Sequence, residues 1–60
     1  MLGEKSYIKR CKSFDIDIVV DSGGFKTVYY VYSKYNEEGE RFENFKELKE
    51  YCDKLIQISV

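Results

Sequence analysis

The sequence has no histidine, and its only two cysteines, Cys11 and Cys52, lie 41 positions apart. Histidine is the usual general base of enzymes and the commonest metal ligand, and zinc sites use closely spaced cysteine and histidine residues. Serine and cysteine nucleophiles also need a neighbouring base to activate them. These absences predict a protein that holds no metal or cofactor and is not an enzyme.

Long apolar runs are absent as well. No stretch approaches the roughly 20 apolar residues that cross a bilayer, and no apolar core of a signal peptide follows residues 1–5. We therefore expect a cytoplasmic protein. In that reducing compartment, Cys11 and Cys52 are predicted to be buried as small hydrophobic side chains and not joined in a disulfide.

Residues 1–60 are predicted to form one small domain, since 43% hydrophobic and 17% aromatic residues are typical of a folding globular chain. A domain of this size without disulfides or a metal is marginally stable alone, which favours a homodimer. The net charge is only -1, but it is unevenly spread. Residues 1–14 sum to +3, whereas residues 36–54 sum to -3.

Alternating apolar and polar side chains predict a first strand over residues 14–20, followed by a turn at Asp21-Ser22-Gly23-Gly24. Residues 25–35 are rich in Thr, Val and Tyr and predict a second strand that pairs with the first as an antiparallel hairpin. Both faces of this strand carry aromatic rings. We expect the face with Val28, Tyr30 and Tyr32 to be covered by a second copy or another partner.

Residues 36–41 read as a polar, acidic loop. Asn44 with Glu47 three residues later has the spacing of a capping box, which predicts a helix whose apolar stripe contains Phe45, Leu48, Tyr51 or Cys52, and Leu55. Alternation over residues 55–60 predicts a closing strand. The predicted fold is α+β, with one helix on a small three-stranded antiparallel sheet in the order β-β-α-β. Residues 1–12 are predicted to form either a mobile basic arm or an added edge strand.

Two binding functions fit these charges. Spaced carboxylates can imitate DNA phosphates, and the neighbouring Phe42, Phe45, Leu48 and Tyr51 could either line a groove or fill the core. In the alternative, Tyr7, Lys9, Arg10 and Lys12 contact nucleic acid directly. The central segment is weakly similar to methyl-CpG-binding and integrase-arm domains, which lay a small sheet in a DNA groove. Those domains have basic residues where this chain has Glu37, Glu38 and Glu40.

Residues 13–60 resemble the small dimeric uracil-DNA glycosylase inhibitors of Bacillus phages. The shared features are SFDIDIVV at residues 13–20, the Tyr29-Tyr30-x-Tyr32-x-Lys34 run, the Asn44-Phe45 pair and the closing LIQISV. The resemblance implies a non-enzymatic homodimer that binds the host glycosylase as a DNA mimic and blocks uracil excision repair. It also implies no direct contact with nucleic acid, and the lack of long apolar runs predicts no membrane partner.

The resemblance also implies partner-binding residues. Its groove aromatic falls on Phe45, the preceding apolar position on Phe42, and Leu48 continues the groove. The family's acidic residue aligns with Lys46, so that its role passes to Glu43 or Glu47, and Tyr51 is the nearest substitute for the family's helix tyrosine. An acidic protein that binds another host DNA-binding enzyme would give the same pattern.

Overall fold

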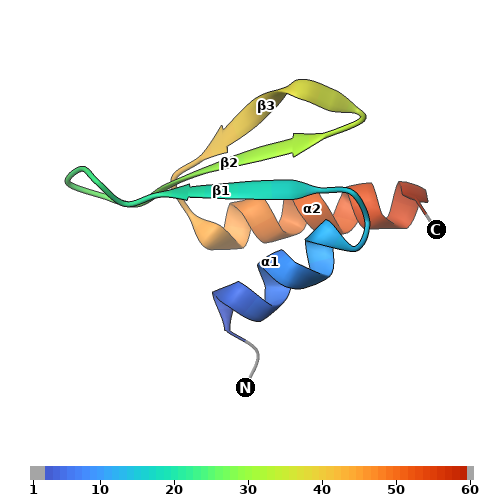
Figure 1. Cartoon of the computed structure of the whole chain (residues 1–60), viewed down its shortest axis with the longest axis horizontal. Helices are drawn as coiled ribbons and strands as arrows, with labels where there is room; N and C mark the ends of the chain where they lie inside the picture. Colours follow the sequence, from blue (N-terminus) through green and yellow to red (C-terminus); the bar gives the residue numbers. More distant parts are fainter. Residues whose placement is uncertain (1–2, 60) are drawn as a thin grey trace.

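The computed structural model describes residues 3–59 of the chain. Its elements follow the order α-β-β-β-α (Figure 1). They are α1 (Glu4–Lys12), β1 (Asp17–Asp21), β2 (Val28–Ser33), β3 (Asn36–Phe42) and α2 (Phe45–Ser59). The predicted α+β class and the three-stranded antiparallel sheet are confirmed. The predicted β-β-α-β order is wrong, because a helix precedes the sheet, the third strand lies between β2 and α2, and α2 is the last element of the described residues.

Helix α1 replaces the predicted arm or edge strand. Glu4 lies in its first turn, and the basic Lys9, Arg10 and Lys12 lie in its last turn, where each charge complements the helix dipole. Tyr7 and Cys11 are four residues apart and share the buried face. Because α1 buries only Tyr7 and Cys11, its apolar stripe is short, and the basic residues around it hid the helical pattern in the sequence.

The β1–β2 hairpin is antiparallel, as predicted, with Val19 opposite Tyr30 and Ile18 opposite Val31. Both strands are shorter than the predicted ranges, 14–20 and 25–35. Residues 13–15 form the turn after α1, where Asp15 has a positive φ of 62°. Phe25 lies in the loop before β2 and is fully exposed.

Strand β3 occupies the segment that was predicted to be a loop. A two-residue turn at residues 34–35 leads into it, and β3 pairs with β2 through Tyr29–Phe42 and Tyr30–Arg41. The Gly39 N–H donates to Asn36 Oδ1 at 3.2 Å. Glutamate is uncommon in strands, so composition alone indicated a loop, whereas pairing with the apolar β2 decides the structure.

Helix α2 begins at Phe45, as predicted, because the Asn44 Oδ1 accepts the Lys46 N–H at 2.7 Å. The helix continues through the predicted closing strand to Ser59. Leu55 and Ile56 are buried and extend the stripe begun by Leu48. The prediction of a strand over residues 55–60 is wrong. Leu55 and Ile56 are adjacent and both buried, which fits the period of a helix and not the alternation of a strand. Val60, part of that predicted strand, lies outside the described residues.

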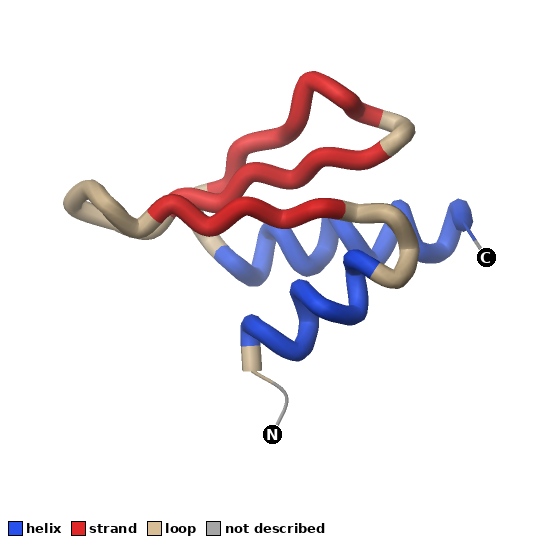
Figure 2. Tube along the Cα trace, viewed as in Figure 1, coloured by secondary structure: helices blue, strands red, loops and turns tan. Residues whose placement is uncertain are grey.

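Both helices lie on the same face of the sheet, and the opposite face has no covering element among residues 3–59 (Figures 1 and 2). The core lies between the sheet and the helices. Its buried members are Tyr7, Cys11, Ile16, Tyr29, Val31, Leu48, Cys52, Leu55 and Ile56. Neither helix in the described part of the chain is long and apolar enough to cross a membrane.

Candidate partner-binding surfaces

The uncovered face of the sheet, which we call the open face, carries the side chains predicted to meet a partner. Val28, Tyr30 and Tyr32 all project from this side of β2, whereas the alternate residues of β2 are buried under the helices. Val19 lies opposite Tyr30 and is 49% exposed. Because alternate residues of a strand point to opposite faces, the open face combines tyrosine rings with valine side chains.

The ring of Tyr32 lies against Gly39 of β3 on the open face. Gly39 has a φ of 91°, and a Cβ built there would lie 2.5 Å from Tyr32 Cε1. Glycine is therefore required both for the backbone conformation and for the room it leaves to the ring. This contact fixes the ring of Tyr32 over β3, and the whole residue is 36% exposed.

The outer edge of the sheet is acidic. Glu37, Glu38 and Glu40 lie on β3, which pairs only with β2, and all three are exposed. Within residues 3–59, none of the three forms an ion pair. The Glu40 carboxylate accepts a hydrogen bond from the Asn36 Nδ2 at 3.3 Å. This edge therefore carries negative charge that neighbouring cations do not neutralise.

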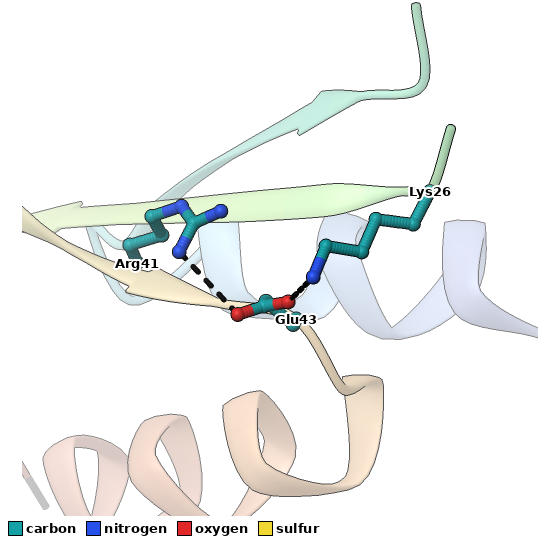
Figure 3. A network of polar contacts seen from close by, with 3 residues as sticks. All are labelled: Lys26, Arg41 and Glu43. Carbon is teal, nitrogen blue, oxygen red and sulfur yellow. Dashed lines mark hydrogen bonds and ion pairs between the residues drawn. The ribbon is translucent and has the colours of Figure 1, made fainter. Parts of the chain in front are cut away.

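Glu43, predicted to contact the partner, lies at the junction of β3 and α2 between two cations (Figure 3). Lys26 binds one carboxylate oxygen, and Arg41 Nη1 lies 3.4 Å from the other. The hydrogen bond and charge of Lys26, with Arg41 as the second cation, lower the pKa of Glu43. Its charge is thus largely balanced within the chain. Glu47 is exposed in the first turn of α2, and the structure gives it no ion pair within residues 3–59.

The predicted groove residues pack against the sheet. Leu48 is completely buried and has no surface left for a partner. The rings of Phe42 and Tyr51 lie 5.2 Å apart, and the ring of Phe45 lies 5.5 Å from that of Tyr29. Phe42, Phe45 and Tyr51 keep part of their surface exposed. Of the two readings left open by the sequence, these contacts correspond to the core.

A groove of about 630 Å³ lies between α1 and the first half of α2. Tyr7 and Phe45, whose ring centroids are 5.8 Å apart in an edge-on arrangement, are its aromatic lining. Arg10, Lys46 and Lys49 make its rim basic, together with two acidic residues, Glu4 and Asp53. The sequence analysis missed this groove, because it exists only when the basic head of the chain is a helix.

A polar contact joins the two helices beside this groove. The Tyr7 hydroxyl donates to the Asp53 carboxylate, with Oη 2.6 Å from Oδ1, and the Lys49 carbonyl oxygen lies 3.1 Å away as a second acceptor. Burial, the hydrogen bond to Asp53 and the nearby thiols raise the pKa of Tyr7. Tyr7 is therefore a structural residue of the helix pair, and the whole residue is only 8% exposed.

The two cysteines, predicted to be buried, are both free and completely buried. Burial raises the pKa of both thiols, that of Cys52 to about 12, so they stay protonated at neutral pH. In the described part of the chain, no group of three or more metal-binding side chains is placed to hold an ion.

No family model, curated protein or solved structure matches this chain.

Proposed function

We propose that this protein is a non-enzymatic DNA mimic, which pairs with a second copy through its open face and presents the carboxylates of β3 to the DNA-binding groove of another protein. The resemblance noted in the sequence indicates a bacterial uracil-DNA glycosylase as that protein. The same resemblance implies a phage protein that acts in the host cytoplasm and prevents uracil excision repair. The two free thiols are consistent with a reducing compartment.

The observation that carries the proposal is the unpaired charge of β3. Glu37, Glu38 and Glu40 follow one edge strand, and three residues of a strand advance roughly 10 Å. Carboxylates held along a line attract a cationic channel over long distances and resemble the phosphates that such a channel binds. The resemblance implies this role for Glu43 or Glu47, but Glu43 already has two cationic partners, so we assign the role mainly to β3.

The open face supports the dimer. Tyrosine is among the residues that contribute most to protein interfaces, and small domains gain stability by association. Val28, Tyr30 and Tyr32 lie together on β2, with Val19 beside them on β1. A two-fold axis over this face would bury the same patch of each copy. The β3 edges would then stay free to meet the enzyme.

The test is uracil excision from a labelled duplex by a bacterial uracil-DNA glycosylase, with a slight molar excess of this protein over the enzyme. We expect excision to stop near one dimer per enzyme. E38K/E40K should slow association at least tenfold, whereas the matched control E47K/E50K, which changes the charge equally on α2, should slow it less. Uninhibited excision with the wild-type protein would contradict the proposal. A larger effect of the α2 variant would move the contact to Glu47.

A second candidate is a sheet-based DNA-binding module, which the open face favours because Tyr30, Tyr32 and Arg41 lie on it. Two carboxylates on the same face oppose this function, since Asp17 lies opposite Tyr32 and Asp21 opposite Val28. A module should bind duplex DNA with a steep salt dependence. The DNA mimic should not bind duplex DNA at all.

A further inference from the structure

The two cysteines lie in the same buried cluster, Cys11 on α1 and Cys52 on α2, although they are 41 positions apart in the sequence. Each has an exposed fraction of 0% and belongs to the same buried cluster. Each thiol lies near enough to the other to affect its pKa. One turn before Cys11, Tyr7 bonds to Asp53, the residue that follows Cys52. This hydrogen bond holds together the two helical segments that carry Cys11 and Cys52.

Helix α1 depends on few side chains for its position. Its nine residues include only two buried ones, Tyr7 and Cys11. A helix this short is unstable alone in water, so its structure depends on these contacts. One of the two anchors of α1 is thus a thiol that shares its buried cluster with a second thiol, on α2. A covalent bond at this point would hold α1 against the rest of the domain.

We propose that Cys11 and Cys52 form a reversible disulfide that fixes α1 to α2 when the protein meets a low-molecular-weight disulfide. The inference does not depend on the proposed function, because it uses only the packing of the helices. It makes the thiol pair a modification site, whose reduced form is the one the structure has.

The reaction is two successive thiol–disulfide exchanges. The Cys11 thiolate attacks one sulfur of the small disulfide, which forms a mixed disulfide on Cys11 and releases one small thiol. The Cys52 thiolate then attacks the Cys11 sulfur and releases the second small thiol. The two cysteines lose two electrons, which the small disulfide gains, and their two protons end on the two released thiols.

Access limits the rate of the first exchange. Both thiols are completely buried, and burial raises the pKa of each. The attacking thiolate therefore forms when α1 separates from α2. Thiol-reactive reagents should label the native protein at least 100-fold more slowly than the protein unfolded in urea. Equal labelling rates would contradict the burial on which the inference depends.

The test is to incubate the full chain with oxidised glutathione and to measure the intact mass and the melting temperature without reductant. We expect a loss of about 2 Da and no reactive thiols, both reversed by dithiothreitol. The melting temperature should rise by about 10 °C or more, because the bond closes a long loop of the unfolded chain.

The matched controls are Cys11→Ala and Cys52→Ala, which each leave one thiol. Each should stop at the mixed disulfide or at a disulfide-linked dimer, with no comparable gain in melting temperature. The wild-type result is decisive even if a variant fails to fold. A wild-type product that carries glutathione on both cysteines, or an internal disulfide that leaves the melting temperature unchanged, would overturn the inference.

Discussion

The two faces of the sheet use similar residues for different ends. Tyr29 and Val31 of β2 are buried under the helices, whereas their neighbours Tyr30 and Tyr32 lie on the open face. Each face therefore presents aromatic and β-branched side chains. What distinguishes them is the chain's own helices, which cover one face only (Figure 1). The covered face therefore supplies the buried packing that stabilises the fold, whereas the open face remains available for binding.

The largest effect is expected on the covered face. Leu48→Ala removes a completely buried side chain and should lower the free energy of unfolding by about 2–5 kcal/mol, enough to unfold much of so small a domain. Urea denaturation followed by circular dichroism measures this loss. If Tyr30→Ala on the open face proved equally costly, the contrast between the two faces would be wrong.

Alkaline pH should weaken the same covered side. The folded chain raises the pKa of Tyr7, Cys11 and Cys52, so these groups bind protons that the unfolded chain releases. Their contribution is complete below about pH 8 and is lost as the pH rises past the unfolded values, about 8.5 for a thiol and about 10 for tyrosine.

Cys52 alone is expected to lower the free energy of unfolding by about 2 kcal/mol by pH 10, because its pKa is about 12 in the folded chain and a group contributes about 1.4 kcal/mol per pH unit above its unfolded value. Urea midpoints between pH 7 and pH 10 measure it. Cys52→Ser should reduce the slope with pH, whatever it does to the stability at pH 7. A flat profile in the wild-type protein would contradict the buried thiol pair.

Gly39→Ala should have a smaller effect, which acts through the open face. The substitution places a Cβ against the Tyr32 ring at a φ of 91°, and such strain costs about 1–3 kcal/mol. Thermal melting measures the loss, with Gly24→Ala as the control, since a Cβ at Gly24 meets nothing within 4 Å. Equal melting temperatures for the two variants would mean that Tyr32 is not held against β3.

The smallest effect on the folded monomer is expected on the open face. Tyr30→Ala should change the free energy of unfolding of the monomer by less than about 1 kcal/mol, because no element of residues 3–59 packs over that face. Urea denaturation at nanomolar protein, well below the concentration at which the wild type is expected to pair, isolates this value. A larger loss would indicate that Tyr30 stabilises the monomer.

The sequence was sufficient where one period dominated. Alternation in β1 and β2 gave the hairpin and separated its two faces, and Asn44 marked the start of α2 through its side-chain hydrogen bond. Both signals are local, so they depend on residues a few positions apart.

The sequence was insufficient where distant segments decide the structure. β3 exists because its acidic chain pairs with the apolar β2, and the helical end of α2 exists because Leu55 and Ile56 reach the core. The burial of the candidate groove residues could not be predicted either, because distant segments of the folded chain enclose Leu48. Likewise, Cys11 and Cys52 become neighbours only through the pairing of α1 with α2.

Sedimentation equilibrium of the wild-type protein and of Tyr30→Lys tests most directly whether the open face binds a second copy. We predict a wild-type dimer at micromolar concentration and a folded monomer for the variant, because a charge placed in a buried interface costs several kcal/mol. A wild-type protein that stays monomeric up to millimolar concentration would contradict the account, as would a variant that pairs as tightly as the wild type.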